Sequence, residues 1–545
     1  MKKERTEETT PDLSFWISAK FKIILLLASF AGGTLYAAAL PPLNWNLLIF
    51  AALIPLLYVP VVSGWKMRFF CGWVWGLGWS FFSYNFLREI HPAVPWLLAP
   101  VISLWPAVFT LAAGWFAVKY FDREKIVKPW CFDTSLLKST GYIFTAGILF
   151  TLIEWTRYYL FVWNDLSVTL WKIPELMQIA SLTGRYGLSF LILLVNGALF
   201  ALIFFKRRWS TAGIALIYPV IAQIYGIYRM KEPESYREPV TWKCALIQGD
   251  LPQQRRATAE EVFNSIVVYA TMSLPYAGKA DTIIWPECAI PIPYRADYPL
   301  AESFRKVISR MGAQMLMGTL DYTPDKKLTN GVLLIQPGGE IAGKYDKYHR
   351  VPFGEYVPFR QWIPESWVKA FDMGRDLSAG TSMKPLTVKD GVVAGTAVCY
   401  EGVFSYLING FARNGANVLT AVSNDVWYPE SSEPEQHLAN AVLRCVETGL
   451  PMIRCGNNGG SGVVTKKGVF TQYIGQKATR PELLREKASG TVEVTLERNP
   501  EKTPAVRFEN FFIVLLAVVL LAANIPLFVP QRRRRHNARK PQRVY

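Results

Sequence analysis

The sequence predicts an integral membrane protein that carries one large α/β domain in water. Three observations predict this fold class: long apolar runs fill about the first 230 residues, the middle of the chain has soluble composition, and one apolar run returns near the C-terminus. With 545 residues, of which 51% are hydrophobic, the chain is too long for one ordinary soluble domain. We therefore expect five parts: a cytoplasmic segment at 1–20, seven membrane helices within 21–230, an exported domain at 240–500, an eighth membrane helix at 509–530 and a basic cytoplasmic tail at 531–545.

The membrane helices are predicted from the length of the apolar runs. A run of about 18 residues or more is long enough to cross a hydrocarbon core about 30 Å thick. The expected spans are 21–40, 45–63, 68–88, 93–119, 139–163, 188–205, 211–228 and 510–529. The first run ends in "YAAAL", whose small residues also resemble a signal-peptide cleavage site, so a cleaved leader is the alternative for this run.

Lys and Arg in the short loops predict the orientation of the spans. With eight spans, both termini lie on one side of the membrane, and the head "MKKER" and the tail "QRRRRHNARK" are both basic. We expect that side to be cytoplasmic, so the soluble domain faces away from the cytoplasm. The net charge of +17 then serves topology and anionic lipid, and we expect no nucleic-acid partner.

The seven cysteines do not follow a metal-binding pattern. They form no CxxC pair and no Cys/His ligand spacing, so we expect no metal site. Five of them fall in the exported domain, so at least one has no intramolecular disulfide partner there. A free thiol kept in an oxidising compartment is a feature that needs an explanation.

Within the exported domain, short apolar strands alternate with helical segments. In chain order we expect a strand at 240–251, a helix at 258–274, a strand at 280–287, a helix leading into a strand at 301–320, a hairpin at 331–348, a strand at 392–401, a helix and strand at 405–425, a helix and strand at 433–457, and a hairpin at 460–474. This alternation, with hairpins added, predicts an α/β layered fold with mixed sheets.

Three polar residues stand where an apolar strand or hairpin gives way to a loop. Glu287 closes "TIIWPE", Lys347 follows the hairpin in "GKYDKYHRVPFGEYVP", and Cys399 ends "GTAVC". Sites in α/β folds are assembled from strand ends and their loops, so we interpret the three as candidate catalytic residues. The competing interpretations are a helix cap for Glu287, an exposed hairpin charge for Lys347 and a core thiol for Cys399.

These three side chains form a set for acyl transfer that does not need histidine. A Cys thiol has a pKa of about 8.5 and needs a base or a positive neighbour to become a nucleophile. Glu287 can accept the thiol proton, and Lys347 can hold that carboxylate and stabilise the oxyanion of a tetrahedral intermediate. The rival set pairs Cys399 with His349 or His437 in a papain-like arrangement. His437 falls in a helical stretch, where a structural histidine is the commoner interpretation.

The motifs around these residues resemble the nitrilase superfamily. Four of them follow in its order and spacing: "WPE" (285–287), "KYDKYHRVPFGEYVP" (344–358), "CYE" (399–401) and "SNDVWY" (423–428). With membrane spans on either side, the chain resembles the apolipoprotein N-acyltransferase family. Two stretches of the membrane part, "LPPLNW" (40–45) and "QIASLTGRYGLSFL" (178–191), also resemble signatures of that family. The resemblance implies a nitrilase-like α-β-β-α sandwich mounted on eight membrane helices, in the bacterial inner membrane, with the catalytic domain in the periplasm.

Carried over by motif, the resemblance implies a role for seven residues. Glu287 would be the general base, Lys347 the oxyanion-stabilising lysine and Cys399 the nucleophile. The supporting residues would be Glu355, which positions the site, together with Tyr400, Glu401 and Trp427, which surround the nucleophile and lie on a mobile loop.

The sequence departs from the family pattern in three stretches, of which one, "NNGGSG" (457–462), is richer in glycine than usual. Arg255 and Arg256 stand in a region where the family usually has Lys-Trp. Pro429 and Glu430 follow the "NDVWY" motif where glycine is common. None of these departures removes a predicted catalytic residue, but because of each of them the resemblance does not define which lipid the protein prefers.

The function implied by the resemblance is acyl transfer without a cofactor. The donor would be a phospholipid, with phosphatidylethanolamine attacked at its sn-1 ester, and the acceptor would be the diacylglyceryl-modified N-terminal cysteine of an apolipoprotein. A thioester on Cys399 would link the two half-reactions, which predicts ping-pong kinetics. We expect a monomer in the membrane. The alternatives are a membrane-tethered nitrilase-like amidase that passes the thioester to water, and a lipid-binding module with a decayed site.

Overall fold

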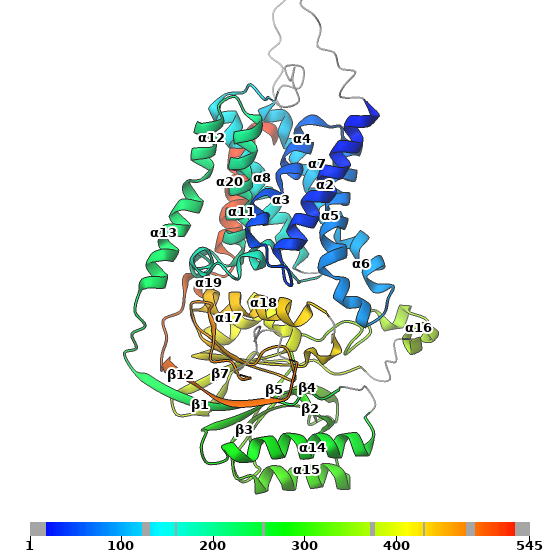
Figure 1. Ribbon diagram of the computed structural model, residues 1–545, viewed down its shortest axis with the longest axis vertical. Coiled ribbons are helices and arrows are strands. Elements are labelled where there is room, and N and C mark those ends of the chain that lie inside the picture. The colour runs from blue at the N-terminus through cyan, green and yellow to red at the C-terminus, as the bar shows by residue number, and fades with distance from the viewer. Residues whose placement is uncertain are drawn as a thin grey trace, which may run out of the picture.

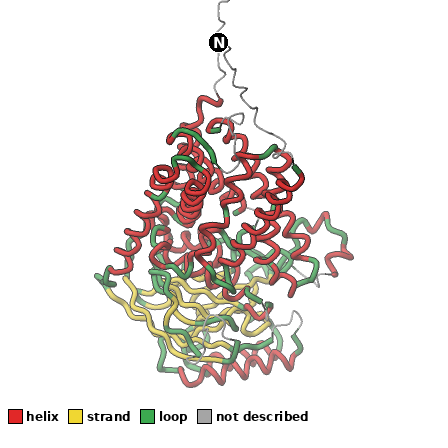
Figure 2. Tube along the Cα trace, turned by 45° about the horizontal axis from the view of Figure 1, so that its top comes forward, coloured by secondary structure: helices red, strands yellow, loops and turns green. Residues whose placement is uncertain are grey.

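The structure is a computed structural model that describes residues 18–121, 131–158, 161–252, 257–370, 376–428, 431–475 and 485–528. A helical domain lies against a layered α/β domain, and the chain passes from α13 of the first into β1 of the second (Figure 1). After β12 the chain returns to the helical domain as α20 (Figure 1). Figure 2 shows the strands held between helices on both sides.

The helical domain combines the N-terminal helices with the last one. Their bounds are α2 (Ala19–Ala39), α3 (Ile49–Ala52), α4 (Ile54–Val62), α5 (Trp65–Ser83), α6 (Val94–Ile102), α7 (Leu104–Tyr120), α8 (Leu136–Arg157), α9 (Pro174–Met177), α10 (Ala180–Thr183), α11 (Arg185–Phe204), α12 (Arg208–Ala215), α13 (Ile217–Lys231) and α20 (Phe511–Phe528). Within the described ranges, four helical segments are long and apolar enough to cross a membrane, or five if the bent pair α12 and α13 is one span. The chain is therefore a multi-pass membrane protein.

The other three expected spans fall short of this criterion for local reasons. The segment expected at 45–63 is an apolar helical segment over Asn46–Val62, in which α3 and α4 meet at Leu53, and it is shorter than the 18 residues of a span. The segment expected at 68–88 corresponds to α5, which is 19 residues long but carries Lys66, Arg68 and several Trp, Gly and Ser residues. The last expected span, 510–529, is described as an apolar helix only over Phe511–Asn524.

Two six-stranded sheets form the middle of the α/β domain. The first has the order β12 (Ala488–Glu497), β1 (Pro239–Gln248), β2 (Thr282–Pro293), β3 (Met315–Tyr322), β4 (Leu328–Ile335) and β5 (Ile341–Asp346). The second has the order β11 (Phe470–Thr471), β10 (Gly462–Val464), β9 (Met452–Gly456), β8 (Val418–Ser423), β7 (Val392–Val398) and β6 (Leu386–Lys389). Each sheet has parallel central pairs and antiparallel outer pairs, so both are mixed.

Helices cover the outer face of each sheet and complete an α-β-β-α sandwich. The helices of this domain are α14 (Ala259–Ser273), α15 (Pro299–Arg310), α16 (Glu365–Ala370), α17 (Ser405–Arg413), α18 (Glu433–Thr448) and α19 (Pro504–Arg507). On β1, Trp242 and Leu246 belong to the core between the sheets, whereas Ala245 and Ile247 belong to the core under α14 and α15. This division follows from the alternation of side chains along a strand.

The helix α18 lies between the second sheet and the membrane domain, and all of its residues are buried (Figure 1). Gln436 makes the contact with the membrane domain. Its Oε1 accepts hydrogen bonds from Trp163 Nε1 at 2.8 Å and Asn164 Nδ2 at 2.7 Å. Its Nε2 donates to the backbone oxygens of Pro41 and Ser83, each at 3.2 Å. Three separate loops of the membrane domain therefore meet on one side chain.

A buried ionic cluster holds the same end of the membrane domain together. Asp165 contacts Arg157 of α8 and Arg185 of α11, each at 2.7 Å, and all three side chains are at most 7% exposed. The guanidinium of Arg157 also donates to Tyr84 Oη at 3.0 Å and lies over the Trp79 ring. Because two cations share one carboxylate, the loop that carries Asp165 is fixed against both helices.

We expect Asp165→Ala to destabilise the protein strongly. Removing one partner of a buried ion pair costs about 3–5 kcal/mol, because the other charge is left uncompensated. The thermal unfolding midpoint of the purified protein in detergent measures this effect. Asp133→Ala is the matched control, since the Asp133–Lys206 pair is about two-thirds exposed and should leave the midpoint unchanged. Equal midpoints for the two variants would contradict a structural role for Asp165.

Candidate active site

The thiol of Cys399 lies at a sharp turn directly after β7. The turn covers Cys399–Val403, and Cys399 itself has a φ of 52°, an uncommon conformation for a residue with a side chain. Glu401 fixes the turn internally, because its Oε2 accepts a hydrogen bond from the Val398 backbone N at 2.8 Å. The thiol is half-buried. Cys399 therefore sits at the end of a strand, as the sequence predicts, and is not a packed core thiol.

Glu287 lies within β2 and not at its end. The strand continues to Pro293, but its pairing with β3 shifts between Trp285 and Ile290, so Glu287 stands at an irregularity in the sheet. The backbone approaches β3 closely here: a Cβ added at Gly318 would lie 2.3 Å from the Pro286 oxygen. Glycine at 318 therefore permits the bulge that aims this carboxylate out of the strand.

Lys347 is buried between two carboxylates. It follows β5 directly, and its Nζ lies 3.1 Å from Glu287 Oε1 and 3.1 Å from Glu355 Oε1. The lysine side chain is only 2% exposed. The structure thus brings together Glu287, Lys347 and Glu355, which are up to 68 residues apart in the sequence, and places none of them as an exposed hairpin charge or a helix cap.

The amide of Asn330 is a further member of this cluster, and the motif analysis missed it. Its Nδ2 donates to Glu287 Oε1 at 2.7 Å and to Glu355 Oε1 at 2.8 Å. Asn330 belongs to β4, where it is a buried polar residue at the start of the apolar run "GVLLI". That polar residue in a buried strand was the available signal, because a buried amide needs hydrogen-bond partners.

Glu401 links the turn of the nucleophile to the loop that follows Lys347. Its Oε1 accepts three hydrogen bonds, from the Tyr345 hydroxyl at 2.8 Å and from the backbone N atoms of Tyr348 and His349 at 2.7 and 3.0 Å. The carboxylate is completely buried. One side chain therefore sets the positions of the thiol and of the lysine relative to each other.

The remaining predicted site residues lie on the side of the membrane domain or at the surface. The Tyr400 ring stacks on Trp163 at a centroid distance of 6.0 Å, and its hydroxyl donates to the Val162 oxygen at 3.2 Å. Trp427 is 41% exposed in the turn after β8. Arg255, Arg256 and Pro429, the positions that depart from the family pattern, lie outside the described residues.

Burial controls the ionisation of the cluster. Burial raises the pKa of the Cys399 thiol well above its usual range, the charge of Glu287 raises it further, and Lys347 opposes the rise. For Lys347, burial works against the charged form, but the attraction of Glu287 and Glu355 outweighs it and raises the pKa well above its usual value. Lys347 is therefore a permanent cation. Burial also raises the pKa of Glu401 to about 7, against the effect of its hydrogen-bond donors.

The two histidines that could rival the trio make different contacts. His349 packs on Phe404 at a centroid distance of 3.8 Å, and its Nδ1 faces the Tyr406 hydroxyl at 3.1 Å. His437 lies in α18, with Nδ1 3.1 Å from Asp425 Oδ1 and Nε2 2.9 Å from the backbone oxygen of Cys399. Neither histidine has a hydrogen bond to the thiol in the part of the chain that the structure describes.

One group of potential metal donors overlaps with this site. The donor atoms of Cys399, Asp425 and His437 lie within 4.8 Å of one another. Both nitrogens of His437 already face oxygen atoms of Asp425 and of the Cys399 backbone. Binding a metal would require His437 to give up one of these contacts.

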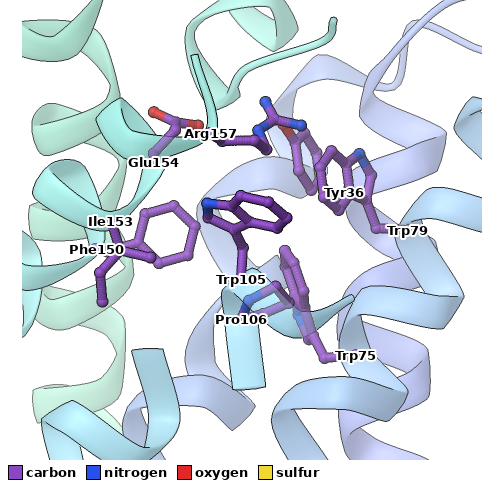
Figure 3. Close-up of a pocket in the computed structure, with 9 residues that line it drawn as sticks. All are labelled: Tyr36, Trp75, Trp79, Trp105, Pro106, Phe150, Ile153, Glu154 and Arg157. Carbon is purple, nitrogen blue, oxygen red and sulfur yellow. The ribbon is translucent and has the colours of Figure 1, made fainter. Parts of the chain in front are cut away.

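An aromatic pocket lies in the membrane domain behind the contact with α18. Trp75, Trp105 and Phe150 contribute rings, and Glu154 and Arg157 lie together at one end (Figure 3). That end is connected to the α/β domain, because Arg157 Nη2 donates to the Asn164 oxygen at 3.3 Å and the Asn164 side chain donates to Gln436. The pocket therefore borders the surface on which the candidate active site is mounted.

Two protein-family models match the chain in the two regions. Carbon-nitrogen hydrolase matches residues 243–480, and the apolipoprotein N-acyltransferase N-terminal domain matches residues 32–198. The first match covers the α/β sandwich and the second covers most of the membrane helices. Cys399 and Lys347 both fall within the carbon-nitrogen hydrolase match.

Curated relatives named apolipoprotein N-acyltransferase align with most of the chain. One from Geobacter metallireducens is 30% identical over 61% of this chain and 66% of its own length. One from Brucella suis biovar 1 is 30% identical over 73% of this chain and 75% of its own length. One from Allorhizobium ampelinum is 28% identical over 81% of this chain and 86% of its own length. A solved carbon-nitrogen hydrolase from Helicobacter pylori is 17% identical over 50% of this chain and 94% of its own, with a TM-score of 0.34.

We expect Glu401→Ala to loosen the loop that carries Lys347. The change removes three hydrogen bonds to Tyr345, Tyr348 and His349, each worth about 0.5–1.5 kcal/mol, so the loop should open at least about tenfold more often. Limited proteolysis with trypsin measures this as faster cleavage after Arg350, which lies in that loop. Glu302→Ala, on the exposed surface of α15, is the control and should be cleaved at the wild-type rate. An unchanged rate in Glu401→Ala would show that other contacts hold the loop.

Proposed function

The chain belongs to the apolipoprotein N-acyltransferase family, and from this premise we propose that it transfers an acyl chain from a membrane phospholipid to the amino terminus of a lipoprotein. It is an enzyme of the carbon-nitrogen hydrolase superfamily. The donor in this proposal is phosphatidylethanolamine, which is attacked at its sn-1 ester. The acceptor is the α-amino group of the diacylglyceryl-modified N-terminal cysteine of an apolipoprotein.

The observation that carries the proposal is the buried contact of Lys347 with Glu287 beside the Cys399 turn. A thiol with a raised pKa needs a base, and Glu287 is the carboxylate whose charge acts most strongly on it. An ammonium that stays charged can stabilise an oxyanion. Glu355 and Asn330 support this pair, because Glu355 binds Lys347 and Asn330 donates to Glu287.

In the first half-reaction, the Cys399 sulfur attacks the ester carbonyl while Glu287 takes the thiol proton. The carbonyl oxygen becomes an oxyanion next to Lys347. The intermediate collapses by breaking the ester C–O bond, and the lysophospholipid leaves as an alcohol that takes its proton from Glu287. The acyl group remains on sulfur as a thioester.

In the second half-reaction, the amine of the lipoprotein attacks the thioester carbonyl. Glu287 accepts a proton from the attacking nitrogen, the C–S bond breaks, and the sulfur leaves as a thiolate. The proton on Glu287 then returns to the sulfur. The enzyme ends in its starting state, and the two substrates occupy the site in succession, which is the ping-pong order.

We further propose eight membrane spans, with both termini in the cytoplasm and the catalytic domain in the periplasm, bounded at 21–230, 240–500 and 509–530. Support comes from packing: α20 lies beside α8 and α11, and Phe512 of α20 contacts Phe190 of α11. The segments at 45–63 and 68–88 pack among the longer spans, since α4 and α5 contact α2 and α7. We also propose that the protein acts as a monomer and that its partners are the phospholipid donor and the diacylated apolipoprotein acceptor.

Incubation with phosphatidylethanolamine should acylate Cys399. Mass spectrometry of the protein and its peptides should place one acyl group on Cys399, and none should form in Cys399→Ala. A general base contributes about 10²–10⁴-fold, so Glu287→Gln should slow thioester formation by that factor. Glu302→Gln, on the distant helix α15, should react at the wild-type rate. An acyl group found on another residue would disprove the proposed nucleophile.

The same assay separates the transferase from the amidase-like alternative. With labelled phospholipid and a diacylglyceryl-cysteine peptide, the proposal requires the label on the peptide amine. Release of the label as free fatty acid at the same rate with and without the peptide would instead support hydrolysis.

Labelling with a membrane-impermeant maleimide should test the orientation. Cys131 is exposed and lies in a loop that we place in the cytoplasm, so it should react only after the cells are permeabilised. Phe263→Cys, on the exposed side of α14, should react in cells whose outer membrane alone is opened. Peptide mapping identifies each labelled cysteine. The reverse pattern would disprove a periplasmic catalytic domain.

A further inference from the structure

His437 is buried between a carboxylate and the backbone of the candidate nucleophile. Its side chain is 4% exposed. Its Nδ1 lies 3.1 Å from Asp425 Oδ1, and its Nε2 lies 2.9 Å from the backbone oxygen of Cys399. One ring nitrogen is within 4.8 Å of the Cys399 sulfur. No part of the mechanism above uses this histidine.

Both ring nitrogens of His437 face groups that can only accept a hydrogen bond. A backbone carbonyl oxygen has lone pairs and no proton. Asp425 is an ionised acceptor, because its Oδ2 binds the guanidinium of Arg454. Burial alone would raise the pKa of Asp425, but Arg454 and His437 outweigh this effect and hold the pKa below its usual value. A neutral imidazole has one N–H and one lone pair, so it can satisfy only one of these two acceptors.

We propose that His437 is a positioning residue, held as an imidazolium between Asp425 and the Cys399 backbone oxygen, which fixes the nucleophile turn and places a positive charge beside the sulfur. The inference deepens the proposed function, because it concerns the same thiol. The groups that face the ring are Asp425, Glu433 of its own helix and the Cys399 turn, with Arg454 behind Asp425.

The charges of this cluster are consistent with a positive histidine. Burial and the charge of Asp425 raise the pKa of Glu433 well above its usual range, which favours its neutral form. Asp425 then carries one negative charge and Arg454 one positive charge. An imidazolium leaves the cluster with one positive charge in excess, which a thiolate at Cys399 would neutralise.

Cys399 needs both effects of this contact. Its left-handed backbone conformation is strained for a residue with a side chain and persists only where its surroundings fix it. The hydrogen bond from His437 holds the carbonyl of this residue directly. Burial also opposes the thiolate, and a nearby positive charge favours the thiolate over the thiol.

The histidine is held in place by the membrane domain. The preceding residue, Gln436, bonds to Trp163 and Asn164, and the Trp163 ring lies 5.9 Å from the His437 ring. The position of the imidazolium therefore depends on the contact between the two domains. An imidazolium with both protons engaged has no lone pair for the thiol proton, so His437 does not act as a papain-like base.

The rate of Cys399 alkylation by iodoacetamide tests the charge without any lipid substrate. Full-length His437→Gln keeps a side-chain N–H for the Cys399 oxygen but carries no charge. We expect its alkylation at neutral pH to be about tenfold slower, with the pH profile moved to higher pH, because loss of a positive neighbour disfavours the thiolate. His91→Gln, an exposed histidine in the loop before α6, should keep the wild-type profile. An unchanged profile in a folded His437→Gln would overturn the inference.

The protonation of His437 can also be read in the unmutated site, which covers the case of a His437 variant that does not fold. The chain has four histidines, so ¹⁵N-histidine NMR spectra of His91→Gln, His349→Gln and His536→Gln assign the His437 signal by elimination. We expect both ring nitrogens of His437 to be protonated at neutral pH. A neutral tautomer would overturn the inference. If acyl transfer fails but the alkylation profile shifts as expected, the proposed function falls and the role of His437 on the thiol stands.

Discussion

The structure depends on one constraint: an ammonium and two carboxylates are buried together at the place where three strands end or bend. A buried charge is tolerated only when it is paired and hydrogen-bonded, and Lys347 meets this condition through Glu287 and Glu355. Asn330 supplies a donor to both carboxylates. Each of the four groups contacts two of the others, so removal of any one leaves two neighbours with a single partner inside the cluster.

The same constraint extends to the turn that presents the thiol. Cys399 has a left-handed conformation in a turn that two contacts fix: Glu401, within the turn, accepts from the Val398 backbone N, and His437 bonds to the Cys399 oxygen. Glu401 reaches the loop of Lys347, whereas His437 belongs to the helix that contacts the membrane domain. The candidate nucleophile is therefore positioned by contacts that arise in four separate stretches of the chain.

Much of this arrangement could be predicted from the sequence, because the strand-end rule selects Glu287, Lys347 and Cys399 without knowledge of their contacts. The layered fold with mixed sheets was predictable for the same reason: strands and helices alternate clearly. The motifs do not include Asn330, and the sequence names His437 only as a rival base for Cys399, because only tertiary contacts show what a residue inside a strand or a helix touches. The span count was the least secure, because composition alone does not show that the apolar run at 45–63 forms a helical segment shorter than 18 residues, nor how far Trp, Gly and Arg lower the apolar character of α5.

The complete burial of α18 limits where this chain can be divided. The outer helices of a soluble sandwich domain have one side exposed to water, but α18 has no exposed side. It carries four long polar side chains, all of them buried: Glu433, Glu435, Gln436 and Arg444. Truncation at the start of β1 would remove the partners that Glu435 and Gln436 have in the membrane domain. The membrane domain therefore covers the side of α18 that would otherwise be open to water.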